Sequence, residues 1–162
     1  MKKLILLVLL FSTFSCAKDE PKPFSEQHTE QEIFNALIGT WQANRLSYDE
    51  DFKQIEYTEY DSCWKKYHIT FTIDSVAETL AGCTGSHSQG TFYVQKQQLN
   101  GSENIKIKLQ QDLIIYLSPT TYHTGGIVLH NCTDTTLIFS GASLEKDEGS
   151  IDHLYSEFKR VK

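Results

Sequence analysis

The sequence predicts an all-β protein, an antiparallel up-and-down β-barrel with a short N-terminal helix. From residue 41 onward, hydrophobic residues recur with a period of two, which is typical of strands with one buried face. The alternating segments are short and separated by polar turns, and no connection between them is long enough to hold a crossover helix. A meander of about eight to ten such strands leaves unpaired edges unless it closes, so we expect a closed barrel.

The chain has room for one domain and an N-terminal appendage. It contains 162 residues, of which 40% are hydrophobic and 22% are charged. Near the N terminus, Lys2 and Lys3 precede an apolar run over residues 4–11. This run is too short to span a bilayer, and the order of basic and apolar residues is typical of a secretory signal. We therefore expect a signal peptide over residues 1–15.

The segment Thr13-Phe14-Ser15-Cys16 resembles the lipobox of bacterial lipoproteins, although Thr13 and Phe14 depart from the common Leu and small residue. Residues 17–23 resemble the surface-export signal of lipoproteins in Bacteroidota. The resemblance implies lipidation at Cys16 and an anchor in the outer membrane, with exposure at the cell surface of a Gram-negative bacterium. Several acyl chains on one residue anchor a protein firmly. The alternative is cleavage by an ordinary signal peptidase beside an unmodified Cys16.

Residues 16–28 carry two prolines, several charges and few apolar side chains, so they predict a flexible tether. Loss of Lys2 and Lys3 changes the formal charge from −6 to −8. An acidic chain is a poor match for nucleic acid. The partner that we expect is therefore the membrane, reached through the lipid anchor, and we expect the protein to be a monomer.

The domain over residues 29–162 begins with a short helix. Thr29 and Glu32 have the spacing of a capping box. The apolar residues that follow share one side of the helix and suit the cover of a barrel end; they are Ile33, Phe34, Leu37 and Ile38. Gly39 is predicted to end the helix in the left-handed conformation, before a strand that starts at Trp41.

Two hairpins are predicted in the middle of the chain. The strand over residues 67–73 alternates polar residues with apolar ones, namely Tyr67, Ile69, Phe71 and Ile73. Asp74-Ser75 then supplies a turn, and residues 76–81 return beside it. The second hairpin joins the segments 91–98 and 102–109 through Asn100-Gly101, the strongest short hairpin signal in the chain. Its register places Leu99 opposite Ser102, and it therefore pairs Val94 with Ile107 and Phe92 with Leu109.

The remaining segments of strand length lie at residues 113–117, 127–131, 135–140 and 154–161, with weaker ones at 42–46 and 54–59. In the segment 154–161, Arg160 shares a face with Leu154 and Phe158, whereas Glu157 and Lys159 lie on the other face. A charged side chain on an apolar face requires a partner.

Three motifs together resemble the bacterial lipocalin-like domain of secreted lipoproteins. They are the helix leading into Gly39-Thr40-Trp41, the segment 133–139 and the closing segment 157–161, and the likeness covers about residues 37–161. The resemblance implies that Trp41 lies at the closed end of the barrel and that Arg160 packs across it. A guanidinium stacked on an indole satisfies an inward-facing arginine, so we interpret this pair as a structural clasp.

The same resemblance implies a disulfide between Cys63 and Cys83, which an exported protein can form in an oxidising compartment. The hairpin at Asp74-Ser75 is compatible with it. Cys132 takes the place of a buried aliphatic residue of the family and is expected to be an inert free thiol. Pairing of Cys132 with Cys63 or Cys83, or three reduced thiols, remain alternatives because connectivity does not follow from sequence.

No catalytic constellation is recognisable, so we expect neither an enzyme nor a cofactor. The six histidines show no spacing typical of a metal site, and His68 and His130 are predicted to be solvated on polar strand faces. Ser86-His87-Ser88 lacks the context of a nucleophile elbow. The tripeptides beginning at Asp74 and Asp134 resemble O-glycosylation sites at Ser75 and Thr135, although both are also ordinary turn sequences.

Two binding functions remain. In the first, the barrel is a calyx for a small apolar or amphipathic molecule, and its predicted wall is formed by Tyr67, Phe71, Phe92, Val94 and Phe139. In the second, the barrel is solid, and loop 118–126 with Tyr122 and His123 contacts a protein or a glycan. An eight-stranded barrel is just wide enough either to be filled by its own side chains or to hold one small ligand.

Overall fold

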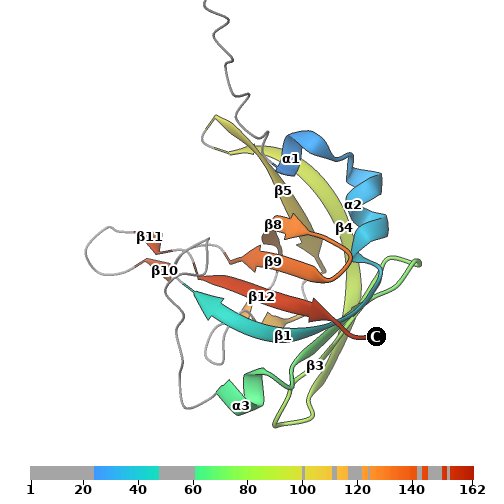
Figure 1. The fold of residues 1–162 in the computed structure, drawn as a ribbon, viewed down its shortest axis with the longest axis vertical. Coiled ribbons are helices and arrows are strands. Elements are labelled where there is room, and N and C mark those ends of the chain that lie inside the picture. The colour runs from blue at the N-terminus through green and yellow to red at the C-terminus, as the bar shows by residue number, and fades with distance from the viewer. Residues whose placement is uncertain are drawn as a thin grey trace, which may run out of the picture.

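Eight strands form a closed antiparallel barrel in the order β1-β12-β9-β8-β5-β4-β3-β2 (Figure 1). The computed structural model describes residues 24–47, 61–99, 101–110, 113–116, 122–123, 125–141, 144–145, 151–152 and 154–162. The barrel strands are β1 (Gly39–Ser47), β2 (His68–Phe71), β3 (Val76–Leu80), β4 (His87–Leu99), β5 (Ser102–Leu109), β8 (Ile127–Cys132), β9 (Thr136–Ser140) and β12 (Tyr155–Arg160). Each pairs with the next barrel strand along the chain, and β1 pairs with β12. The predicted up-and-down barrel is confirmed.

Smaller elements accompany the barrel. Two short hairpins pair β6 (Ile115–Tyr116) with β7 (Tyr122–His123) and β10 (Leu144–Glu145) with β11 (Ile151–Asp152). The helices are α1 (Phe24–Gln27), α2 (Glu30–Leu37) and α3 (Asp61–Trp64). Within the part of the chain that the structure describes, no helix is long and apolar enough to cross a membrane.

Helix α2 begins with the predicted capping box. The Thr29 hydroxyl accepts a hydrogen bond from the Glu32 backbone N–H at 3.2 Å, and the Glu32 carboxylate accepts one from the Thr29 N–H at 2.7 Å. Two members of the predicted apolar stripe, Ile33 and Leu37, are buried in the core. The helix packs against β4 and β8, and its apolar side joins the core of the barrel, as expected.

The register predicted from Asn100-Gly101 is confirmed. Leu99 pairs with Ser102, Val94 with Ile107, and Phe92 with Leu109. Strand β4 is longer than the predicted segment 91–98 because its first part pairs with β3 and its second part with β5. Residues 87–90 contain no apolar side chain, so alternation did not reveal the first part of the strand.

The hairpin of β2 and β3 corrects one prediction. Tyr67, Ile69 and Phe71 are buried as expected, but Ile73 is 74% exposed. Strand β2 ends at Phe71, and residues 72–75 form the turn to β3, where alternation no longer decides which side chain is buried. Ile73 therefore belongs to the surface.

Two further segments differ from their predicted structure, and a third lies outside the described residues. The predicted flexible tether over residues 16–28 is wrong at its end, because residues 24–27 form α1 and Phe24 packs against the core. The predicted strand 113–117 is reduced to β6, and the predicted strand 54–59 lies outside the described residues, as does Cys16.

Candidate functional site

The predicted calyx wall is part of a filled core. Tyr67, Phe71, Phe92 and Phe139 are at most 2% exposed. Their rings contact one another and Phe158: the Phe71 and Phe92 centroids lie 4.8 Å apart, and those of Phe139 and Phe158 lie 5.7 Å apart. A preformed ligand cavity would leave such rings exposed to the ligand or to water. In this structure the four aromatic residues therefore stabilise the fold.

Val94, the fifth predicted wall residue, packs against the edge of this core. It is only partly buried, and it lies with Tyr93 in a depression on the barrel surface. The structure thus does not bring the five predicted residues together around one cavity.

Polar atoms enter the core near α3. The Thr79 hydroxyl donates to the Ile114 carbonyl at 3.2 Å, and the Tyr67 hydroxyl donates to the same oxygen at 3.4 Å. The Trp64 ring packs edge-on against Phe158 with 5.9 Å between centroids, and its buried N–H has no hydrogen-bond partner in the structure as described. Among the described residues, this part of the core thus combines aromatic packing with hydrogen bonds to one backbone carbonyl.

Arg160 makes the expected contact with Trp41. The guanidinium carbon lies 4.0 Å from the centre of the Trp41 ring. Its nitrogens also donate to three backbone carbonyls, those of Ala36 at 2.6 Å, Ile38 at 2.6 Å and Asp134 at 2.8 Å. The first two carbonyls belong to the C-terminal end of α2, where backbone acceptors lack helical partners and favour a cation. This second role of Arg160 was not predicted from the sequence.

Gly39 has a different role from the predicted one. The helix ends at Leu37 with Ile38 as its extended C-cap residue, and Gly39 is the first residue of β1 with a φ of +132°. A Cβ atom at this position would collide with the guanidinium of Arg160. The prediction of a left-handed helix cap is therefore wrong, and the glycine is required by the strand conformation and by the arginine beside it.

The disulfide joins Cys63 in α3 to Cys83 in the turn after β3, with 5.0 Å between their Cα atoms. The neighbouring Gly82 has no space for a Cβ atom, which would overlap the Cys63 carbonyl. Cys132 is free and buried. Burial raises the pKa of its thiol to about 11, so the thiolate is scarce at neutral pH. The cysteine pairing implied by the family resemblance is thus present.

A groove of about 610 Å³ lies between α1 and the strands β8 and β9. Its volume falls in the range of known small-molecule sites, which is about 300–1,000 Å³. The lining consists of Phe24, Gln27, His28, His130, Asn131, Cys132, Thr133 and Ile138. Apolar surface and hydrogen-bonding groups thus meet in one place, which is the combination that an amphipathic molecule requires.

A β-bulge shapes this groove. The pairing of β8 with β9 shifts between Leu129 and Asn131, which leaves His130 as the extra residue. Bulges re-aim side chains and often lie beside functional sites. The His130 Nε2 atom lies 2.6 Å from the Ser140 hydroxyl, and its ring packs edge-on against Tyr155. The predicted solvated His130 is therefore wrong, because the bulge and its neighbours hold the ring partly buried.

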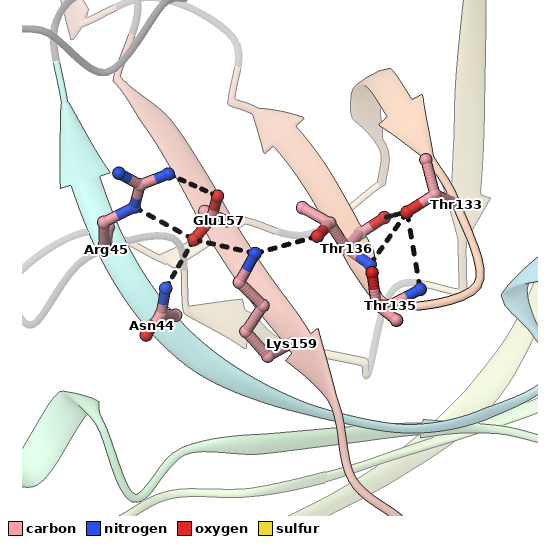
Figure 2. Close-up of polar contacts among 7 residues, drawn as sticks. All are labelled: Asn44, Arg45, Thr133, Thr135, Thr136, Glu157 and Lys159. Carbon is pink, nitrogen blue, oxygen red and sulfur yellow. Dashed lines mark hydrogen bonds and ion pairs between the residues drawn. The ribbon is translucent and has the colours of Figure 1, made fainter.

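A second bulge, at Asn44 in β1, lies beside a buried carboxylate on the barrel wall (Figure 2). Glu157 is 3% exposed, and it accepts hydrogen bonds from Asn44 and from Arg45, whose Nε and Nη2 lie 3.0 and 2.6 Å from its two oxygens. Lys159 lies 3.5 Å away. Burial alone raises the pKa of Glu157, but these hydrogen bonds and charges outweigh it and the pKa is lowered.

This network braces the seam between the first and last strands. The Lys159 ammonium also donates to the Thr136 hydroxyl at 2.8 Å, which extends the brace to β9 (Figure 2). The Thr133 hydroxyl accepts the N–H groups of Thr135 and Thr136 in the adjoining turn. Asn44, Arg45 and Lys159 all bond to the Glu157 carboxylate, so we assign the network to stability.

The other candidate residues are less informative. Tyr122 and His123 form β7, but their side chains lie outside the described part of the structure. Ser75 and Thr135 both lie in turns, as predicted. Among the described residues, no group of three or more His, Cys, Asp or Glu side chains could hold a metal ion.

Comparison with models of known protein families finds no match to this chain, and comparison with curated protein sequences finds none either.

Proposed function

We propose that the protein is a lipocalin-like lipoprotein of the bacterial outer membrane, anchored through Cys16, which binds a small apolar or amphipathic molecule. The observation that carries the binding function is the groove between α1, β8 and β9. It combines the rings of Phe24 and His28 with the polar side chains that the bulge at His130 presents. We therefore assign the binding site to this groove and not to the barrel interior, because aromatic side chains fill the interior.

The groove offers separate contacts for two parts of a ligand. Phe24 and Ile138 provide apolar surface, whereas Gln27, Asn131 and Thr133 provide hydrogen-bond donors and acceptors. Binding sites of this kind obtain most of their affinity from apolar contact and their specificity from a few polar groups. An amphipathic molecule satisfies both sets at once.

Native mass spectrometry of the protein purified from its own membranes tests this function. Ile138→Trp fills the groove and should abolish any co-purified mass. Val128→Trp is the matched control, because Val128 is a partly buried aliphatic residue on β8 that does not line the groove. A bound mass that survives Ile138→Trp, or the absence of any ligand from the unsubstituted protein, contradicts the assignment.

The anchor has its own test. The lipobox-like residues before Cys16 and the acidic segment after it support acylation and surface exposure. Labelled palmitate should enter the protein, and Cys16→Ala should abolish the label. Protease added to intact cells should then remove the barrel. Label that persists after Cys16→Ala contradicts the anchor, and resistance to protease in intact cells contradicts surface exposure.

The filled core also favours a second function, in which a solid barrel contacts a protein or a glycan through its loops. Loop 118–126, with Tyr122 and His123, is the candidate surface. Deletion of this loop should abolish crosslinking of the barrel to a surface partner. The molecule that co-purifies in the groove should still be detected by native mass spectrometry. Unchanged crosslinking after the deletion contradicts this second function.

A further inference from the structure

Two exposed apolar side chains lie together on the barrel surface. Ile73 is 74% exposed and Tyr93 is 58% exposed, although they are far apart in the chain. Both line a depression of about 390 Å³, together with Phe34 and Val94. Clusters of exposed apolar residues mark contact surfaces far more often than isolated ones do. We call the set Ile73, Tyr93, Phe34 and Val94 the apolar patch.

The turn that presents Ile73 is held in place. The Thr72 N–H donates to the Val76 carbonyl at 2.8 Å, and the Phe92 N–H donates to the Ser75 carbonyl at 2.9 Å. Ser75 has a φ of +62°, in the left-handed region that non-glycine residues rarely adopt. Ile73 is therefore displayed by a defined turn at the end of the barrel where β2 stops.

The apolar patch lies on the side of the barrel to which the N-terminal segment leads. Glu30, Gln31 and Phe34 of α2 form one wall of the depression, and α1 precedes α2 along the same side (Figure 1). Phe24, at the start of α1, is eight residues from Cys16. An extended chain of that length spans at most about 28 Å, so an acylated Cys16 would hold this side close to the bilayer.

We propose that the apolar patch contacts the interfacial region of the lipid bilayer and fixes the orientation of the anchored barrel. This inference rests on the proposed anchor, since a short tether raises the local concentration of lipid and makes a weak contact effective. Tyrosine is enriched at membrane interfaces, where its ring meets acyl chains and its hydroxyl meets water. Ile73 supplies the apolar side chain that enters deepest.

The charges around the apolar patch indicate which lipids suit it. Asp74 follows Ile73 in the turn, and Glu30 lies in the wall of the depression. These carboxylates repel anionic headgroups, so the patch fits a zwitterionic surface. We expect the contact to weaken as anionic lipid is added and to change little with salt on zwitterionic membranes.

A tethered vesicle assay tests the contact without depending on acylation. In the mature chain a histidine tag replaces Cys16 and attaches the protein to phosphatidylcholine vesicles that contain a little nickel-chelating lipid. A fluorophore is attached through Asp74→Cys or, as the matched control, through Leu80→Cys at the opposite end of β3. Leu80 is also an exposed apolar residue, at 39%. Nitroxide-labelled lipid then reports the depth of each fluorophore.

Lipid should quench the fluorophore at position 74 and leave that at position 80 nearly unchanged. Ile73→Asp together with Tyr93→Asp should lower the docked population about tenfold. Because both residues are exposed, circular dichroism should show an unchanged barrel.

Equal quenching at the two positions, or no quenching at position 74, overturns the proposal. If the fluorescence instead changes in the absence of vesicles, and more so at higher protein concentration, the apolar patch binds a second copy of the chain and the proposal is overturned. If Cys16 is not acylated, the palmitate experiment shows it. The vesicle assay is unaffected, because the histidine tag attaches the protein to the vesicles.

Discussion

The guanidinium of Arg160 lies over the ring of Trp41, with 4.0 Å between its central carbon and the ring centroid. The same group holds the carbonyls of Ala36 and Ile38 at the end of α2, and the Trp41 indole N–H donates to the Leu37 carbonyl at 2.7 Å. One arginine thus joins the last strand, the first strand and the helix that precedes them.

Arg160→Lys should destabilise the barrel by about 2–4 kcal/mol, because lysine keeps the charge but cannot reach three carbonyls and cover the indole at once. Urea unfolding followed by tryptophan fluorescence measures the change in unfolding free energy. Lys162→Met, at an exposed position two residues further along the chain, is the control and should cost less than about 1 kcal/mol. Equal losses for the two variants would contradict the clasp.

Gly39→Ala should also destabilise the fold, by about 2–4 kcal/mol, since the new methyl group meets the guanidinium and the φ of +132° is strained for alanine. Gly85→Ala is the matched control, because Gly85 also has a positive φ but has open space around its Cβ position. A double-mutant cycle with Arg160→Ala should show coupling at Gly39 and none at Gly85. Additive losses at Gly39 would exclude the collision.

Glu157→Gln should cost about 1–3 kcal/mol, because it leaves Arg45 and Asn44 facing a neutral amide. The pKa of Glu157 is lowered in the folded protein, so its contribution is present above the unfolded-state pKa of about 4.3 and is lost as pH falls through the folded value. Unfolding free energies of the two proteins should therefore differ at pH 7 and converge in acid. A difference that does not shrink in acid would refute this linkage.

Cys132 should resist alkylation while the barrel is folded. Its pKa of about 11 makes the thiolate scarce at pH 8, and burial blocks access. In a Cys16→Ala protein, iodoacetamide should react on the order of a hundredfold more slowly than in the urea-unfolded chain. Mass spectrometry measures the rate, and a Leu80→Cys variant supplies an exposed thiol for comparison. A native rate close to the unfolded one would show that Cys132 is accessible.

Hairpin geometry was predictable because it depends on neighbouring residues. Asn100-Gly101 fixed the pairing of Val94 with Ile107, and the capping box fixed the start of α2. Ile73 was misplaced because alternation continues through the sequence while the strand stops. The groove was missed because the bulge at His130 depends on how β8 pairs with β9, and because α1 packs beside strands that lie about 100 residues further along the chain.

The sequence by itself determined the all-β barrel class, the antiparallel order, the register of the hairpin between β4 and β5 and the identity of the arginine that needed a partner, because periodicity and turn chemistry act over a few residues. Tertiary structure decided whether the barrel is hollow. The large side chains that the alternation points inward, among them Phe71, Phe92 and Phe158, meet at its centre and occupy the space. How much volume remains depends on how these rings interdigitate across the barrel, which no single strand specifies.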